Sequence, residues 1–469
     1  MAASLRASEQ GLEILDRARR KKGWTKKEEA WWQLALSSQA TLKRFLEGKQ
    51  RIKQDAFISL CQAVGIENWE EIAEDNSIQR TDSLLSWFSY DDNWVGREEA
   101  IAHLSEKLRG TCRVLILTGI TGIGKTALAE RLAVELQGYW AECCRLNFDD
   151  KERVTDFASV AAELLAGWHE TVMPEERANP QQLLNRLVKR LREHRYLVLI
   201  DALERILKGN EETGWSGLAD EWWERFFEQL MTAESCQSRV ILTSQVKSRQ
   251  LEEIGYRYPN FCYMENLSGL TELEQLALFE KIGLEVGETS PHRQYLERIG
   301  AAYEGHPLAL RVIAGEIANS PFKGNVVAYW KKYGHEIEAV EQARQQEKVE
   351  SAEERFRLAG YSPRLQTAVK RRVERTLERL AKEVFNAYLL LCHGSVYRHP
   401  VPEAAWLRGL KRLGYDEQQQ QAALDALRDR YLLEELIDGN DDWLLRQHNL
   451  IRSVAMEHLK NLKTREQPA

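Results

Sequence analysis

Positions 119–126 read Gly-Ile-Thr-Gly-Ile-Gly-Lys-Thr and match the phosphate-binding pattern G-x-x-x-x-G-K-[ST] at every position. The apolar run 114–118 precedes this loop and predicts a buried strand, and residues 127–136 follow it with the spacing of a helix. A strand, a glycine-rich loop and a helix in this order are the context that the pattern requires. The chain is therefore predicted to fold around a phosphate-binding loop.

The residue types in this loop are those that hold nucleotide phosphates. Glycines let the backbone turn tightly and bring its N–H groups close to phosphate oxygens, and the following helix adds the positive end of its dipole. Lys125 is expected to contact the β- and γ-phosphates, and Thr126 to offer its hydroxyl to Mg²⁺. The loop residues predicted to contact ATP or ADP are Gly119, Thr121, Gly122, Ile123, Gly124, Lys125, Thr126 and Ala127. The simpler alternative is a glycine turn in an unrelated α/β domain.

The composition is typical of a soluble globular protein with roughly two to four domains. The chain has 469 residues, of which 43% are hydrophobic and 29% are charged. No apolar run approaches the length of a membrane span, so we expect no membrane contact. The seven cysteines are scattered and form no C-x-x-C pair, which is typical of a reducing compartment. We therefore expect a cytoplasmic protein with free thiols.

Positive charge is concentrated at the start of the chain. The whole chain has a net charge of −7, yet its first 53 residues contain 13 basic and 6 acidic residues. A basic segment on an otherwise acidic chain indicates a partner for that segment alone. The segment belongs to a predicted all-helical domain, with helices expected at 11–22, 25–36, 39–46 and 54–64. Two short helices joined by a tight turn, the second of them basic, are the helix-turn-helix pattern.

The first 70 or so residues resemble the Cro/Xre-type helix-turn-helix family. The matching residues are Ser38, Leu42, Phe45, Glu47-Gly48-Lys49, Leu60 and Val64-Gly65-Ile66. The resemblance implies that the third helix lies in the major groove of DNA. The exposed candidates for contacts with bases and phosphates are then Gln39, Thr41, Lys43 and Arg44. The alternative is a helical adaptor that binds a protein and whose lysines lie on a solvated face.

Strands and helices alternate from Val95 onward. Beyond the strand before the loop, further strands are predicted at 139–148, 196–201, 238–243 and 261–264. Apolar strands separated by helices imply a parallel sheet covered on both faces. After residue 270 the periodicity is mainly helical, for example at 272–282 and 301–317.

Leu197-Val-Leu-Ile-Asp201 has the form of a Walker B strand. Four apolar residues bury the strand, and the carboxylate stands at its carboxyl end, where ligands bind to parallel sheets. Asp201 is therefore predicted to hold Mg²⁺ together with Thr126, directly or through water.

Residues from about 90 to 465 resemble the NB-ARC module of STAND-type signalling NTPases. The matching residues are Val95-Gly-Arg-Glu98, the loop 119–126, the strand ending at Asp201, Arg239 to Gln245, Gly305-His-Pro-Leu-Ala-Leu310 and Gln447-His-Asn-Leu450. The implied fold is an α/β P-loop NTPase core with a parallel sheet, followed by helical and winged-helix domains, after an all-α N-terminal domain. The expected boundaries are 1–74 (helix-turn-helix), 75–92 (linker), 93–268 (nucleotide-binding), 269–375 (helical) and 376–469 (winged helix).

The resemblance also implies roles for residues outside the loop. Val95 and Arg97 would stand next to the nucleotide, Pro307 would pack on the adenine, and His448 would reach the β-phosphate of ADP and lock a closed state. Exchange of ADP for ATP would open the molecule and allow a homo-oligomer to form.

Three departures from the family pattern bear on hydrolysis. Ala202 stands where many members have a second acid, although Glu204 is close enough in sequence to polarise water and joins Asp201 as a candidate catalytic residue. The Thr-Thr-Arg sensor reads Thr243-Ser244-Gln245, so a charge-assisted contact to the γ-phosphate is lost. The His-Asp pair reads His448-Asn449, with an effect that the sequence does not define. We predict tight ADP binding and slow ATP hydrolysis.

The predicted function is a nucleotide-dependent switch in signalling or regulation, with the helix-turn-helix domain as its output on DNA or a protein partner. One alternative is a catalytic AAA+-like ATPase that acts on nucleic acid, which should have a full acid pair and an arginine finger. Another is a plain helix-turn-helix transcription regulator whose P-loop is structural. The sequence leaves these alternatives open.

Overall fold

The computed structural model divides the chain into two compact units, which are described separately. One unit contains Val95–Thr376 and His448–Val454, and the other contains Met1–Trp94, Leu377–Gln447 and Ala455–Ala469. The structure describes all residues except 1–3, 26–27, 36, 48–51, 67–68, 70–71, 73–93, 149–154, 211–213, 247, 351–363, 438–442 and 466–469. The predicted linker at 75–92 therefore lies outside the described residues.

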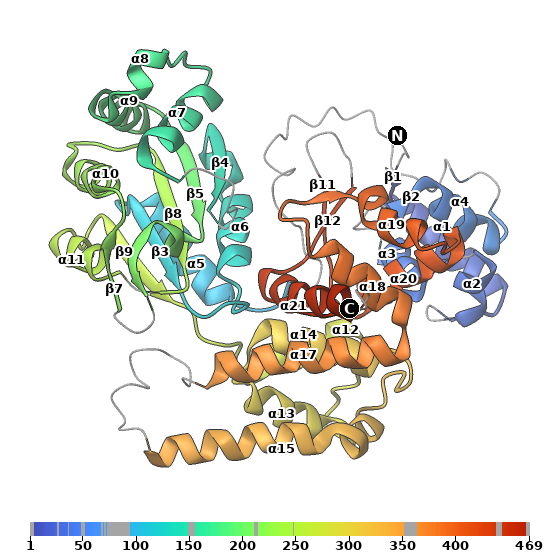
Figure 1. The fold of residues 1–469 in the computed structure, drawn as a ribbon. Coiled ribbons are helices and arrows are strands. Elements are labelled where there is room, and N and C mark those ends of the chain that lie inside the picture. Colours follow the sequence, from blue (N-terminus) through green and yellow to red (C-terminus); the bar gives the residue numbers. More distant parts are fainter. Residues whose placement is uncertain are drawn as a thin grey trace. The chain divides into compact units, whose positions relative to one another are not determined.

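A five-stranded parallel sheet forms the centre of the first unit (Figure 1). Its order is β4 (Glu142–Asn147), β5 (Tyr196–Asp201), β8 (Arg239–Ser244), β3 (Val114–Thr118) and β9 (Cys262–Asn266). Every residue of β3 and β8, two of the three inner strands, is buried, because helices cover both faces of the sheet. The predicted α/β P-loop NTPase core with a parallel sheet is confirmed.

Two boundaries around the phosphate-binding loop differ from the prediction. Helix α6 (Lys125–Glu135) begins two residues early, so that Lys125 and Thr126 form its first turn. Strand β4 begins at Glu142 rather than 139, because the 3-10 turn η3 (Gln137–Tyr139) precedes it. The helix therefore presents its N-terminal N–H groups directly at the loop, as an anion site requires.

The remaining elements of the nucleotide-binding core surround the sheet. Figure 1 shows α10 and α11 on one side of it and α5 and α6 on the other. The elements are α5 (Glu98–Arg109), α7 (Phe157–Gly167), α8 (Pro174–Arg177), α9 (Pro180–Glu193), η4 (Leu203–Ile206), β6 (Leu207–Asn210), β7 (Gly214–Leu218), α10 (Glu221–Thr232) and α11 (Arg249–Arg257). An aromatic cluster that includes Phe157, Trp223 and Phe227 packs in the core beside the sheet.

Further helices follow the sheet: α12 (Glu272–Ile282), α13 (Arg293–Ala302), α14 (Pro307–Ala318) and α15 (Val326–Glu350). The predicted helix at 272–282 is confirmed, whereas the helical pattern at 301–317 is divided between the end of α13 and α14, with a break at 303–306. Pro307 starts a new helix at its first position, because proline lacks the N–H that a continuing helix would need. Helix α17 (Leu365–Glu383) comes next and places the buried Arg372 against Glu316 of α14, with a closest distance of 2.7 Å.

The N-terminal part of the second unit is helical as predicted. It contains α1 (Glu9–Lys21), α2 (Glu29–Leu34), α3 (Gln39–Glu47) and α4 (Gln54–Ala63) around a core that includes Trp31, Phe45 and Phe57. Two features were not predicted. A short antiparallel ladder joins β1 (Ser4–Leu5) to β2 (Ile52–Lys53), and α2 begins only at Glu29, after a turn in which the Glu28 carboxylate accepts a hydrogen bond from the N–H of Thr25.

The C-terminal part of this unit contains α18 (Phe385–Gly394), α19 (Glu403–Arg412), α20 (Glu417–Asp429) and α21 (Asn449–Arg465). Its antiparallel strands lie in the order β10 (Val401–Pro402), β12 (Trp443–Arg446) and β11 (Glu434–Ile437). Helices with a small antiparallel sheet agree with the predicted winged-helix fold, while the exact domain boundaries remain predictions. The start of α21 belongs to the first unit, which includes His448–Val454.

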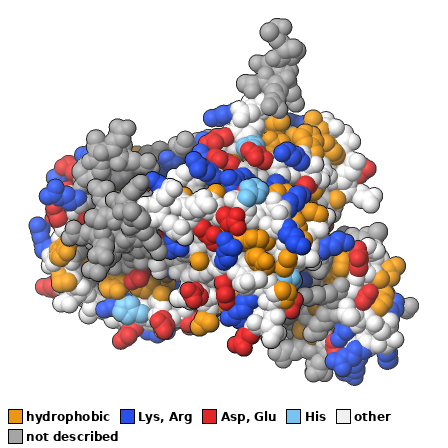
Figure 2. Space-filling view, turned by 90° about the horizontal axis from the view of Figure 1, so that it is seen from below, with side chains coloured by type: hydrophobic (Ala, Val, Ile, Leu, Met, Phe, Trp, Pro, Cys, Tyr) orange, Lys and Arg blue, Asp and Glu red, His pale blue; other side chains and the backbone are white. Residues whose placement is uncertain are grey.

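The described surface carries both signs of charge. Figure 2 shows lysine and arginine side chains interspersed with aspartate and glutamate over the face in view. None of the described helices is both long enough and apolar enough to cross a membrane.

Candidate nucleotide site

The glycine-rich loop leaves β3 and enters α6 through backbone conformations that favour glycine. Gly122 has φ 79° and Gly124 has φ 100°, both in the left-handed region. A Cβ on Gly124 would have no heavy atom within 4 Å, so this side of the loop is open. The loop backbone therefore turns through left-handed residues and leaves space beside Gly124, the residue that caps α6, where an anion at the helix N-terminus would bind.

Lys125 is buried and folds back over this loop. Its Nζ donates to the carbonyl oxygens of Gly119 at 2.8 Å and Ile120 at 3.0 Å. Burial lowers the pKa of this ammonium to about 8, and the carboxylates of Glu204 and Asp201 oppose the shift. A buried cation on neutral carbonyls would gain from an anion placed in the space beside the loop, which fits a nucleotide phosphate.

Asp201 and Thr126, the two predicted metal ligands, lie side by side. The Thr126 hydroxyl donates to Asp201 Oδ1 at 2.8 Å, and the Thr243 hydroxyl donates to the same oxygen. The described residues contain no group of three or more His, Cys, Asp or Glu that could hold a metal ion. One hydroxyl and one carboxylate suit Mg²⁺, which takes few protein ligands and completes its shell with phosphate oxygens and water.

Arg145 of β4 also reaches this carboxylate, and it was missed by the sequence reasoning. Its Nη2 lies 3.2 Å from Asp201 Oδ2, and its Nη1 donates to the carboxylate of Glu130 on α6. The only sequence signal was that charged residues interrupt the apolar pattern of this strand. This signal is weak, because β4 is a half-buried edge strand in which a charged side chain can also face water.

Glu204, the second candidate catalytic residue, is held by Gln245. Its carboxylate accepts from the Gln245 side-chain amide at 2.9 Å and from the Gln245 backbone N–H at 3.1 Å. Gln245, which stands where the family has the sensor arginine, therefore binds the carboxylate of Glu204. Both oxygens of that carboxylate accept a hydrogen bond from Gln245. This arrangement reduces the capacity of Glu204 to act as a base toward water.

Arg97 supports the loop through its backbone. Its Nη2 donates to the carbonyl oxygens of Ile123 and Ser268, each at 2.9 Å, and its own N–H donates to the Glu274 carboxylate. Burial lowers the pKa of Arg97, with the charges of Glu274 and Glu265 opposing the shift. Val95, also predicted to line the nucleotide, is half-buried two residues earlier.

His306, the residue before Pro307, packs against the loop and was not singled out from the sequence. It is fully buried, with Nε2 at 3.0 Å from the Thr121 carbonyl oxygen, while Nδ1 accepts from the N–H of Ala309 at 3.3 Å. These partners require a neutral ring with its proton on Nε2. Burial lowers the pKa of His306 to about 3, the hydrogen bond to Thr121 opposes this shift, and the positive charge of Lys125 adds to it.

Pro307 and His448, the two remaining predicted contacts, stand at helix starts in the same unit. Pro307 is the first residue of α14, directly after His306. His448 precedes α21, and its Nδ1 accepts from the N–H of Leu450 at 3.2 Å. The loop is thus joined to this region by the hydrogen bond that His306 makes with Thr121, 185 positions earlier in the sequence.

The candidate contacts for DNA or a partner lie on α3. Ser38 caps this helix, since its hydroxyl accepts from the N–H of Thr41 at 3.1 Å. Gln39 is exposed, whereas Thr41 and Lys43 are half-buried. Arg44 was expected to be exposed, and this is wrong: its side chain is 16% exposed because its guanidinium binds Glu435 at 2.9 Å.

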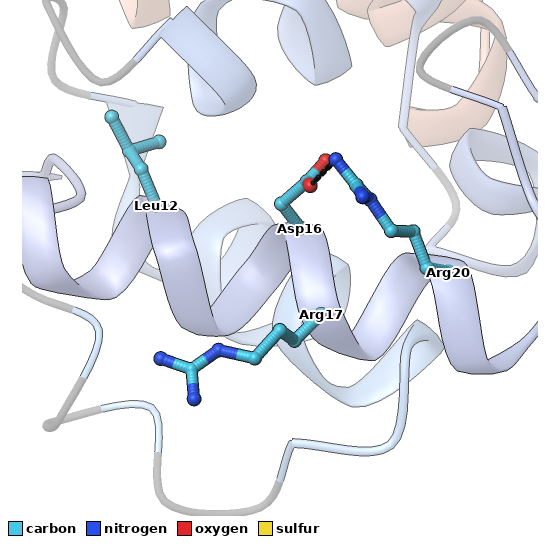
Figure 3. A pocket seen from close by; sticks show the side chains of 4 residues that line it. All are labelled: Leu12, Asp16, Arg17 and Arg20. Carbon is cyan, nitrogen blue, oxygen red and sulfur yellow. Dashed lines mark ion pairs between the residues drawn. The ribbon is translucent and has the colours of Figure 1, made fainter.

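A shallow pocket lies on α1 of the same domain. Leu12, Asp16, Arg17 and Arg20 line it. Figure 3 shows Asp16 and Arg20 paired, at 2.7 Å, with the Arg17 side chain directed away from them. Arg19 binds Asp16 as well, so the acid is already neutralised and the pocket has little capacity for a further cation.

Comparison with known proteins agrees with the geometry of the loop and the sheet. Residues 93–237 match the family model of the AAA ATPase domain. The chain contains a P-loop ATPase domain. Domains of this class bind ATP or ADP with Mg²⁺.

Two curated relatives match over longer stretches. An uncharacterized WD repeat-containing protein of Nostoc sp. is 29% identical over 369 residues, which cover 70% of this chain and 28% of the relative. The disease resistance protein RGA5 of Oryza sativa subsp. japonica is 27% identical over 258 residues, which cover 52% of this chain and 19% of the relative. The chain thus spans less than a third of either relative.

Among solved structures, the crystal structure of Cdc6p from Pyrobaculum aerophilum aligns with 81% of this chain and 98% of its own. The TM-score is 0.36 and the sequence identity 14%.

Proposed function

We propose that this protein is a nucleotide-dependent molecular switch of the STAND/NB-ARC type. ADP and ATP would bind at the loop 119–126 and favour different arrangements of the domains, with the N-terminal helical domain as the output. The single observation that carries the proposal is the convergence of Lys125, Thr126, Asp201 and His306 on one loop at the carboxyl edge of a parallel sheet. The match to RGA5 over about half of the chain supports the same assignment.

The binding chemistry follows from residues of the chain. Lys125 would turn its ammonium from the loop carbonyls to phosphate oxygens, and the N–H groups at the start of α6 would donate to the same anion. Thr126 and Asp201 would hold Mg²⁺, which supplies charge neutralisation at the phosphates when bound. Arg97 fixes the loop backbone from the opposite side through Ile123.

Slow hydrolysis follows from the acids at the site. Asp201 already accepts from two hydroxyls, and Glu204 is engaged by Gln245 through both oxygens. A carboxylate held in this way is a weak base toward an attacking water. The proposal is therefore a slow ATPase whose product, ADP, stays bound, and whose ATP-bound form assembles into a homo-oligomer.

The test is direct measurement of bound nucleotide and of turnover. Freshly purified protein is denatured, and the released nucleotide is quantified by chromatography. We expect close to one ADP per chain, and turnover far below the median enzyme rate of about 10 per second. Lys125→Ala should lose the nucleotide, while Lys189→Ala, which removes the same charge from an exposed position on α9, should retain it. Protein that carries no nucleotide and takes up none would refute the proposal.

A catalytic ATPase that acts on nucleic acid is the second candidate, because residues 93–237 match the AAA ATPase domain. It predicts ATP turnover that rises strongly when DNA is added. The third candidate, a transcription regulator with a structural P-loop, predicts that Lys125→Ala leaves DNA binding unchanged. The same preparations distinguish all three.

A further inference from the structure

Arg145 connects two acids, Asp201 in the candidate nucleotide site and Glu130 on the helix that follows the loop. It lies on the edge strand β4, and its side chain is only 10% exposed. One end of its guanidinium meets Asp201 at the carboxyl end of β5, and the other meets Glu130 on α6. The guanidinium is thus fixed by elements on both sides, in the planar geometry that suits carboxylates.

Glu130 explains why this arginine stays in place. The Glu130 side chain is 4% exposed, one turn beyond the loop on the helix that begins with Lys125. A buried carboxylate without a partner carries a large desolvation cost, so Glu130 requires a cation. Arg145 supplies it and at the same time delivers positive charge to Asp201.

The oxygens of Asp201 are already shared among several donors. Oδ1 accepts from Thr126 and Thr243, and Oδ2 faces Arg145 at 3.2 Å. A magnesium ion held by Thr126 and Asp201 must compete with these donors, directly or through its water shell. The guanidinium therefore provides a fixed positive charge at the carboxylate that a metal would otherwise neutralise.

We propose that Arg145 is a positioning residue that sets the Mg²⁺ requirement of the nucleotide site. It holds Asp201 when no metal is bound, so that ADP stays bound without Mg²⁺. Its positive charge also weakens Mg²⁺ binding, so that Mg²⁺ binds with ATP, whose γ-phosphate supplies further oxygen ligands, and not with ADP. This inference rests on the proposed function, since it assumes that the loop binds ADP and ATP.

The test is a titration of nucleotide binding against Mg²⁺, with a fluorescent ADP analogue and with ATP. Wild-type protein should bind the ADP analogue with similar affinity in EDTA and in excess Mg²⁺. Arg145→Gln should lose about tenfold in ADP affinity in EDTA, because Asp201 and Glu130 then repel the phosphates. For ATP, the Mg²⁺ concentration that gives half of the increase in affinity should fall by about tenfold in Arg145→Gln, because Asp201 and Glu130 then attract the cation without competition from the guanidinium.

Two further variants separate this role from folding. Arg145→Lys keeps the charge and should restore binding in EDTA. Arg145→Gln combined with Glu130→Gln removes the buried acid and should fold with a melting temperature near that of wild type. Its nucleotide affinity in EDTA should still be lower than that of wild type, because Asp201 still lacks its arginine. An Arg145→Gln protein that folds and has the wild-type Mg²⁺ dependence would overturn the inference. Wild-type protein that binds no nucleotide at any Mg²⁺ concentration would instead refute the proposed function.

Discussion

The guanidinium of Arg44 lies 2.9 Å from the carboxylate of Glu435 within one compact unit of the protein. Both side chains are less than one-fifth exposed. Glu435 is itself fixed, because its other oxygen accepts from Arg428 at 2.7 Å, and Arg428 also binds Glu403. A carboxylate thus holds the arginine of α3 that would otherwise be available to a phosphate of DNA.

Removal of this carboxylate charge should increase binding of the helical domain to DNA. In Glu435→Gln, Arg44 loses the carboxylate that binds its Nη1, while the charge of Asp429 stays nearby. We therefore expect tighter binding to double-stranded DNA, by about three- to tenfold at low salt. One more phosphate contact should also steepen the plot of log affinity against log salt by about 1. Fluorescence anisotropy over a salt series measures both quantities.

Glu434→Gln is the matched control for this prediction. It makes the same change on the neighbouring residue of β11, whose carboxylate binds Arg446 instead. DNA affinity should stay at the wild-type value. Equal affinity and slope in both variants would favour a protein partner for α3, in agreement with the adaptor alternative.

His306 should make the stability of the protein depend on pH below neutrality. Its pKa is lowered from 6.5 to about 3 in the folded protein, so the unfolded chain binds a proton in this range and the folded protein does not. The contribution of His306 to the free energy of unfolding is therefore at its full value above about pH 6.5. It decreases as the pH falls below that value, by up to about 1.4 kcal/mol per pH unit. Urea unfolding at pH 7.5, 6.0 and 5.0 measures the loss.

His306→Asn isolates this effect. Asparagine can accept the hydrogen bond from Ala309 as a helix cap but has no proton to gain. The difference in unfolding free energy between wild type and variant should shrink as the pH falls from 6.5 to 5. A constant difference would mean that His306 is protonated in the folded protein or that its site opens to water.

The parts of this architecture that depend on local pattern were predictable. The loop 119–126, the buried strand before it and the acid that ends β5 carry their signals in consecutive residues, because strand burial and glycine turns are local requirements. The contacts that complete the site join distant segments: Arg145 with Glu130, Gln245 with Glu204, and His306 with Thr121. A single sequence contains no signal for such pairs, since each depends on which elements the fold brings together.

The same reasoning explains the two clear errors. The exposure of Arg44 was inferred from one helix, but its burial is caused by a residue 391 positions away. The helical pattern at 301–317 was inferred from apolar spacing, which both α13 and α14 satisfy. The break between them was missed, although Pro307 marks the first turn of a new helix.

Alanine substitutions at two loop glycines should differ in cost. Both have positive φ, which costs an L-residue about 1–2 kcal/mol. A Cβ on Gly122 would also stand 2.9 Å from side-chain atoms of His306 and Leu308, whereas one on Gly124 would meet open space. We expect Gly124→Ala to lose only the backbone cost and Gly122→Ala to lose clearly more, as measured by urea unfolding without nucleotide. Equal losses would show that His306 moves freely.

The buried pair Arg372–Glu316 should be far more costly to break than to replace. Arg372 is fully buried, with both Glu316 oxygens at 2.7 Å from Nη2 and the Tyr329 hydroxyl at 3.0 Å from Nη1. Arg372→Met leaves the Glu316 carboxylate without its cation, and we expect a loss of about 3–5 kcal/mol in unfolding free energy. Arg372→Met combined with Glu316→Leu removes both charges and should recover much of that loss. Glu374→Gln on the same helix breaks an exposed pair with Lys370 and should cost less than about 1 kcal/mol. Urea unfolding of these variants beside wild type gives the coupling energy of the pair. A double variant no more stable than Arg372→Met would contradict the prediction, because it would show that the unpaired charge of Glu316 is not the cause of the loss.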